Sequence, residues 1–172
     1  MAVEFRTAVE SDAPELATFA IAVFSETFGP HNTEGNMRQY LSMALTPAVI
    51  ADQLRRSAGA TILGIKDDTI KAYAMVLPDE PRVHDNIPPG SLFLQRFYLD
   101  SELHGSGVAN ELLDRVIDQA KLKNSDSLWL TVWEHNPRAI RFYEKRGFKT
   151  VGDCPFQFGD EQQRDLVMLR SW

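Results

Sequence analysis

The sequence predicts a mixed α/β (α+β) fold in a single domain that covers residues 1–172. Segments with the apolar pattern of strands alternate with segments whose apolar residues recur every three or four positions, as in amphipathic helices. A length of 172 residues suits one compact core, and neither a repeat nor a clear linker divides the chain. The predicted order, β-α-α-β-β-β-α-β-α-β-β, indicates helices packed on a sheet and argues against a barrel or a bundle.

The first elements are a short strand over 3–9 and a helix that Ser11 and Asp12 open, with Pro14 tolerated in its first turn. Several apolar side chains of this helix recur at helical spacing: Leu16, Phe19, Ala20, Val23 and Phe24. Gly29 and Pro30 break the pattern, so the helix ends there.

A second helix is predicted over 33–56, with a possible interruption at Pro47 because proline disfavours helical angles in the residue before it. Two strands, 60–66 and 69–77, then form a hairpin around the tight turn Asp67-Asp68. The proline-rich segment 78–90 has no periodicity and reads as a loop.

The second half of the chain alternates strands and helices. The predicted elements are a strand over 91–99, a helix over 106–122, a strand over 127–133, a helix over 137–146, and a final pair of strands over 148–152 and 164–172.

Composition excludes several classes of function. The formal net charge of −6 argues against a nucleic-acid partner, which needs clustered cations, and favours a cationic small molecule or a basic peptide. The apolar runs are too short for a membrane span, and residues 1–12 lack the pattern of a signal peptide. Cys154 is the single cysteine, so no internal disulfide and no metal site are predicted. These features predict a cytoplasmic protein.

The most informative stretch joins the strand that ends at Leu99 to the next helix. Gly105, Ser106 and Gly107 lead into that helix, whose unpaired N–H groups and positive dipole end suit a phosphate or pyrophosphate. The helix has a clear apolar stripe: Val108, Ala109, Leu112, Leu113, Val116, Ile117 and Ala120. A tight turn without a ligand is the alternative on glycine spacing alone.

Other phosphate-binding motifs fit this stretch less well. A Walker A loop is excluded because no Gly-Lys-Ser/Thr follows. A dinucleotide fingerprint fits poorly, since Asn110 occupies the position of the third glycine, although Glu134 at the end of the next strand keeps that alternative open.

The second motif is WEHNPRAIRFYEKRGF, residues 133–148. Asn136 is a good helix N-cap, Pro137 suits the first helical position, and Gly147 is well placed to end the helix. These structural roles explain Tyr143 less well. Either its ring packs in the core or its hydroxyl has a function.

Together the two motifs resemble the GCN5-related N-acetyltransferase (GNAT) superfamily. The segment 104–109, HGSGVA, looks like the Gln/Arg-x-x-Gly-x-Gly/Ala core of its motif A, and Asn136 and Tyr143 fall on the family positions of its motif B. The segments 24–41 and 152–172 are similar to the PaiA-like branch, whose members acetylate polyamines and related small amines.

The resemblance implies a mostly antiparallel central sheet flanked by helices, in which strand 91–99 splays from strand 127–133. It implies that acetyl-CoA is the cofactor. Its pantetheine arm would pair with the backbone of Phe97, Tyr98 and Leu99, and its pyrophosphate would bind the amides of the turn. The implied turn residues are His104, Gly105, Ser106, Gly107, Val108 and Ala109, and Asn136 and Tyr143 would lie near the arm and the sulfur. His104 replaces the usual Gln or Arg and is a weaker phosphate donor when neutral.

Acetylation of an amine needs a neutral nucleophile, whereas an alkyl ammonium has a pKa near ~10, so the site must take up a proton. Glu26, His31 and Glu134 are the candidate general bases, although residues of these types at such positions are more often ordinary surface residues. The resemblance makes Tyr143 the acid that protonates the leaving thiolate.

Other residues near the predicted site also have candidate roles. The Leu99 amide is the candidate donor to the thioester carbonyl. Cys154 has no paired histidine in sequence reach and is read as structural. Gln95 and Arg96 face either the acceptor or the core.

The predicted function is therefore an acetyl-CoA-dependent N-acetyltransferase that acts on a primary amine, such as that of a polyamine. Asp79, Glu80 and Asp85 in the 78–90 loop are candidate contacts for the cationic acceptor. The alternatives are a non-catalytic acetyl-CoA-binding regulator of the same fold and a dinucleotide-dependent oxidoreductase. The resemblance also makes a homodimer possible, since dimers are frequent in the family.

Overall fold

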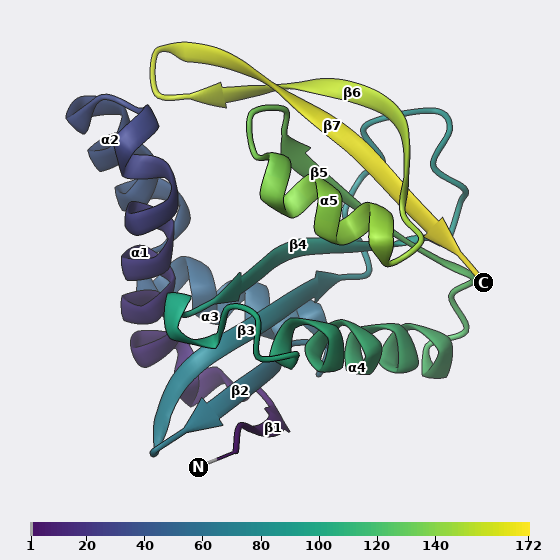
Figure 1. The fold of residues 1–172 in the computed structure, drawn as a ribbon, viewed down its shortest axis with the longest axis horizontal. Helices are drawn as coiled ribbons and strands as arrows, with labels where there is room; N and C mark the ends of the chain where they lie inside the picture. The colour runs from purple at the N-terminus through teal and green to yellow at the C-terminus, as the bar shows by residue number, and fades with distance from the viewer. Residues whose placement is uncertain (1) are drawn as a thin grey trace.

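The computed structural model describes residues 2–172, which form one seven-stranded sheet with helices on both faces (Figure 1). The strands lie in the order β1-β2-β3-β4-β5-β7-β6, and all neighbours are antiparallel except β4 and β5. The strands are β1 (Glu4–Thr7), β2 (Ile62–Lys66), β3 (Thr69–Leu77), β4 (Leu92–Leu99), β5 (Ser127–Trp133), β6 (Lys149–Phe158) and β7 (Glu161–Ser171). The helices are α1 (Ala13–Phe28), α2 (Glu34–Ala44), α3 (Pro47–Ser57), α4 (Val108–Leu122) and α5 (Pro137–Lys145).

This architecture confirms the predicted mixed, mostly antiparallel sheet flanked by helices. It also rules out the dinucleotide-dependent oxidoreductase, whose fold requires a doubly wound parallel sheet, whereas only one pair of these strands is parallel.

Two apolar layers hold the helices to the sheet. The stripe of α4 and the inner face of α5 pack on one face, where Leu112, Leu113 and Val116 are fully buried. Helices α1, α2 and α3 pack on the other face through residues such as Leu16 and Ile50, which are also fully buried. The helical spacing of the apolar residues thus gives each helix one buried face.

The hairpin turn at Asp67-Asp68 is confirmed, and both residues have the positive φ angles, 51° and 57°, of the turn type that joins twisted strands. The helix predicted over 33–56 is interrupted at Pro47, as expected, so that two helices, α2 and α3, occupy this segment. Pro47 forces the preceding Thr46 into extended geometry, and the Thr46 hydroxyl then caps α3 by accepting a hydrogen bond from the Val49 N–H at 3.2 Å.

The final two strands are longer than the predicted 148–152 and 164–172. Polar residues such as Gln157 and Gln162 face each other across this hairpin, so the apolar alternation that marks a strand is weak there. Strand β6 lies at the edge of the sheet, which is also why Pro155 is tolerated within it.

The feature that creates the site is the separation of β4 from β5. The two strands pair only at Leu92–Leu128 and Phe93–Trp129 and then diverge, as Figure 1 shows. A bulge at Gln95, between the pairs Met75–Arg96 and Val76–Leu94, bends β4 at the same point. The predicted splay is therefore confirmed. Within residues 2–172, no helix combines the length and the apolar character needed to cross a bilayer.

Candidate active site

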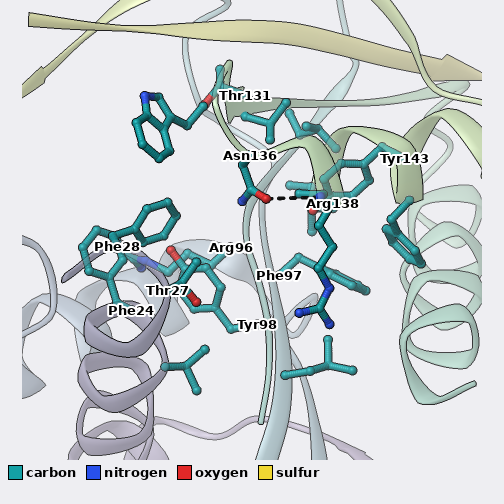
Figure 2. A pocket seen from close by; sticks show the side chains of 18 of the residues that line it. Phe24, Thr27, Phe28, Arg96, Phe97, Tyr98, Thr131, Asn136, Arg138 and Tyr143 are labelled. Carbon is teal, nitrogen blue, oxygen red and sulfur yellow. Dashed lines mark hydrogen bonds between the residues drawn. The ribbon is translucent and has the colours of Figure 1, made fainter. Parts of the chain in front are cut away.

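A cavity of about 580 Å³ lies where β4 and β5 separate, and residues from elements on both faces of the sheet line it. Figure 2 shows Phe24, Thr27 and Phe28 of α1 on one side of this cavity and Arg138 and Tyr143 of α5 on the other. The cavity therefore has two halves: one beside α4 and α5, and one beside α1, α2 and the β6–β7 hairpin.

The glycine turn forms one wall of the α4–α5 half. Gly105 and Gly107 have φ angles of 78° and 90°, which favour glycine, and a Cβ at either would meet no atom within 4 Å. Among the described residues, no acceptor pairs with the N–H groups of Gly105, Gly107 or Ala109. Exposed amides beside open space at a helix N-terminus are suited to a diphosphate.

Two residues of the predicted turn have structural roles. Ser106 and Val108 do not line the cavity. The Ser106 hydroxyl donates to the Leu103 carbonyl at 2.6 Å and accepts a hydrogen bond from the Val108 N–H at 3.3 Å. This side chain therefore holds the shape of the turn.

The predicted pantetheine-binding segment of β4 also lines the cavity. Phe97, Tyr98 and Leu99 pair with β3 along one edge of the strand, while the other edge has no strand partner beyond Phe93 within the described part of the chain. An extended, amide-bearing chain can form hydrogen bonds along such an edge. Gln95 lies at the same edge, and its side-chain oxygen is buried without a protein partner.

Helix α5 places Asn136 and Tyr143 at the cavity. Asn136 is the N-cap, as predicted, and its side-chain oxygen accepts a hydrogen bond from the Ala139 N–H at 3.2 Å. The Tyr143 ring packs edge-on against Phe97 and Phe148, with centroids 6.2 and 5.4 Å away. Burial raises the pKa of Tyr143, so its hydroxyl is protonated at neutral pH.

His104 and Arg138 meet at the mouth of the α4–α5 half. Burial and then the charge of Arg138 lower the pKa of His104, and the smaller effects of Glu26 and Asp100 raise it. His104 is therefore neutral near pH 7. Arg138 was not among the predicted site residues, and its guanidinium points into the cavity (Figure 2). Its position after Pro137 was visible, but its proximity to His104 depends on how α4 and α5 pack.

The other half of the cavity is aromatic and has two buried charges. The rings come from α1, α2, β4, β5 and β6: Phe24, Phe28, Tyr40, Tyr98, Trp133, Phe156 and Phe158. Arg96 and Asp165 also line this half and are 5% and 8% exposed. Gln53 and the Ala44 carbonyl accept hydrogen bonds from Arg96. The sequence predicted either the acceptor or the core as the environment of Arg96, and neither the aromatic wall nor Asp165 was predicted.

The candidate general bases lie outside this cavity. Glu134 lines a neighbouring shallow cavity and forms an ion pair with Arg164 at 2.9 Å, and His31 lines the same cavity. Glu26 is exposed on α1 and does not line the main cavity, although its charge reaches His104. Burial raises the pKa of the Cys154 thiol, which disfavours the reactive thiolate.

Comparison with known proteins identifies the family. Residues 23–148 match the model of the acetyltransferase (GNAT) family. An uncharacterised N-acetyltransferase of Mycobacterium tuberculosis is 31% identical over 161 residues, which cover 94% of this chain and 98% of that protein. The spermine/spermidine N(1)-acetyltransferase of Bacillus subtilis is 30% identical over 77 residues, 44% of this chain and 51% of that protein.

The fold agrees with these matches. The crystal structure of the PaiA N-acetyltransferase from Thermoplasma acidophilum, in complex with coenzyme A, superposes with a TM-score of 0.80 over 100% of both chains at 19% identity. This chain therefore shares the fold of that structure. Together with the family match, this makes it an acetyl-CoA-dependent transferase. The chain belongs to the GNAT acetyltransferase family, and it is an N-acetyltransferase that uses acetyl-CoA.

Proposed function

We propose that this enzyme acetylates the primary amine of a small cationic acceptor such as a polyamine. The observation that carries the proposal is the two-sided cavity. One half has the unpaired amides of the glycine turn and the free edge of β4, and the other has aromatic rings around a buried carboxylate. A donor and an acceptor can approach each other from opposite sides of the sheet through such an opening.

The proposed cofactor half uses the predicted residues. The N–H groups of Gly105, Gly107 and Ala109 bind the diphosphate of acetyl-CoA, with His104 and Arg138 beside it. The backbone of Phe97, Tyr98 and Leu99 and the side chain of Asn136 position the pantetheine arm. Ser106 and Val108 hold the shape of the turn through the hydrogen bond between the Val108 N–H and the Ser106 hydroxyl.

Acetyl-CoA supplies the thioester whose carbonyl carbon accepts the amine. Tyr143 holds a proton on its hydroxyl at neutral pH and is the proposed donor to the leaving sulfur. The Leu99 N–H is the proposed donor to the carbonyl oxygen, because the edge of β4 that faces the cavity has no strand partner there.

Several features support a polyamine as acceptor. The aromatic wall attracts an alkyl ammonium through cation–π contacts and accommodates its aliphatic spacer. The net charge of −6 draws cations toward the protein. The partial similarity to a spermine/spermidine acetyltransferase points the same way. The loop carboxylates do not contribute: Asp79 and Glu80 form ion pairs with Arg56, and none of Asp79, Glu80 and Asp85 lines the cavity.

The experiment is to mix the pure protein with acetyl-CoA and a panel of amines and to follow thiol release. The panel contains spermine, spermidine, putrescine, neutral amines and basic peptides. Faster turnover of the polyamines supports the proposal. Turnover of peptides alone would overturn the polyamine assignment, and coenzyme A binding without turnover of any amine in the panel would overturn a small cationic amine as the acceptor.

The pH dependence of cofactor binding tests His104. The affinity for dephospho-coenzyme A is expected to increase by about tenfold or less as the pH falls from about 8 to about 5.5. His104 is neutral in the free protein, and a nearby diphosphate favours its protonated form, so binding takes up a proton. The ligand lacks the 3′-phosphate, so that group cannot contribute a titration of its own.

Isothermal titration calorimetry at several pH values measures this effect, and His104→Gln should make the affinity independent of pH. If the wild-type affinity does not change over this range, His104 is not beside the diphosphate.

A further inference from the structure

We propose that Asp165 binds the acceptor's ammonium group and removes its proton, and so acts as the general base that sequence analysis did not identify. This inference rests on the proposed function and assigns a residue to its missing step. The assignment differs from the three predicted bases, none of which lines the main cavity.

The position of Asp165 carries the proposal. Asp165 lies on β7 opposite Trp133 of β5 on one side and Cys154 of β6 on the other. Asp165 is 8% exposed, yet it lines the aromatic half of the cavity, as do Thr131 and Gln163. A buried carboxylate at a cavity wall is accessible to a ligand and protected from bulk water.

No cation of the protein neutralises this carboxylate. Among the ion pairs that residues 2–172 form, none includes Asp165. Its neighbour Asp153 pairs with Arg164 at 2.6 Å, so the arginine nearest in sequence is engaged on the outer side of the hairpin. An unpaired buried charge is costly, and an ammonium ligand would relieve that cost.

Arg96 is the other charge in this half. Its guanidinium donates to the side chain of Gln53 and to the Ala44 carbonyl, which hold it toward α2 and α3. The pKa of the Tyr40 hydroxyl is raised by burial, lowered by Arg96 and raised slightly by Asp165. Tyr40 therefore lies close enough to feel both charges. Since Arg96 is held by Gln53 and Ala44, the Asp165 carboxylate is the group that can bind an ammonium.

Aromatic rings complete the ammonium site. Tyr40 stacks on Phe24 and Phe158 with centroids 4.6 and 5.1 Å apart, and Phe156 packs edge-on against Tyr40. These residues and Asp165 line the same cavity. A ring cluster with one carboxylate selects a primary ammonium on a narrow aliphatic chain over an anionic or bulky acceptor.

The same burial makes proton transfer feasible. Desolvation raises the pKa of Asp165, and the neighbouring Thr131 side chain lowers it by a smaller amount. An ammonium that enters the cavity is desolvated too, which lowers its pKa, so the two groups approach each other in acidity.

The protons balance. The ammonium gives one proton to Asp165, which releases it to solvent. The neutral nitrogen then forms the new C–N bond as the C–S bond breaks. Tyr143 gives its proton to the sulfur and regains one from the nitrogen.

The test replaces Asp165 with asparagine, which keeps the size of the side chain and removes only the carboxylate's charge and basicity. We expect kcat/KM for spermidine to fall by about 10²-fold or more. The loss of activity at acidic pH should also extend to higher pH, because without this carboxylate only acceptor that is already neutral can react, and an alkyl ammonium has a pKa near ~10. The other titratable or charged groups near Asp165 are Tyr40, Arg96, Asp153 and Cys154, and all of them remain.

A second readout separates catalysis from structure. Because the pKa of Asp165 is raised in the folded protein, its ionised form destabilises the fold above that pKa, and this penalty vanishes as the pH falls. Asp165→Asn should therefore raise Tm at pH 7 by about 2–4 °C and have little effect near pH 4. A carboxylate that stabilises the fold would give a lower Tm.

Asp153→Asn is the matched control, since Asp153 is a half-exposed aspartate on the neighbouring strand that does not line the main cavity. Its turnover should equal that of the wild type. If Asp165→Asn turns over spermidine at the wild-type rate, Asp165 is not the general base, whereas the proposed function stands. Absence of wild-type turnover with every amine would overturn the proposed function itself.

Discussion

Tyr143→Phe is expected to lower kcat by about 10²-fold or more while the affinity for coenzyme A stays within about twofold. The substitution removes only the hydroxyl, and the ring keeps its contacts with Phe97 and Phe148. Because burial keeps this hydroxyl protonated, it is the proposed proton donor to the sulfur. Steady-state kinetics and calorimetry with coenzyme A measure the two quantities.

Tyr73→Phe provides a matched control. Tyr73 is fully buried, its hydroxyl has no hydrogen-bond partner in the protein, and it does not line the cavity. Loss of the Tyr73 hydroxyl should leave kcat unchanged. If Tyr143→Phe turns over acceptor at the wild-type rate, Tyr143 is not the acid.

Gly107→Glu is expected to weaken coenzyme A binding by about 10²-fold or more. A carboxylate at this N-terminal turn would lie beside the proposed diphosphate, and two like charges at close range repel by several kcal/mol, about 4 kcal/mol at 4 Å in a medium of intermediate polarity. The new side chain would also fill the open space at a residue whose φ of 90° favours glycine. Calorimetry with coenzyme A measures the loss.

Two variants separate the causes. Gly107→Gln has the same backbone strain and nearly the same size without the charge, so it should bind more tightly than Gly107→Glu. Gly90→Glu places the same residue at another glycine of positive φ, 81°, that has open space and does not line the cavity, and its affinity should match the wild type. Normal binding by Gly107→Glu would mean that the diphosphate lies elsewhere.

Local sequence patterns predicted most of the fold. The stripe of α4 and the proline and asparagine at the start of α5 depend on neighbours within one or two turns, so spacing alone reveals them. The interruption at Pro47 of the helix predicted over 33–56 was also visible, because a proline excludes helical geometry in the residue before it, here Thr46, which then caps α3. The hairpin β6–β7 was underestimated because a strand paired by its backbone can have polar side chains on both faces.

The same distinction holds for the site. Gly105, Gly107, Asn136 and Tyr143 could be found from the sequence, because each lies in a short motif whose spacing reflects a local geometry, and all four line the cavity. Asp165 could not be found, because it approaches the cavity only through the pairing of β7 between β5 and β6. Arg138, Arg96 and the aromatic wall likewise depend on how helices and strands from distant parts of the chain pack. The spacing of a motif can be read from the sequence, whereas the contacts that surround an acceptor form only when distant strands and helices pack together.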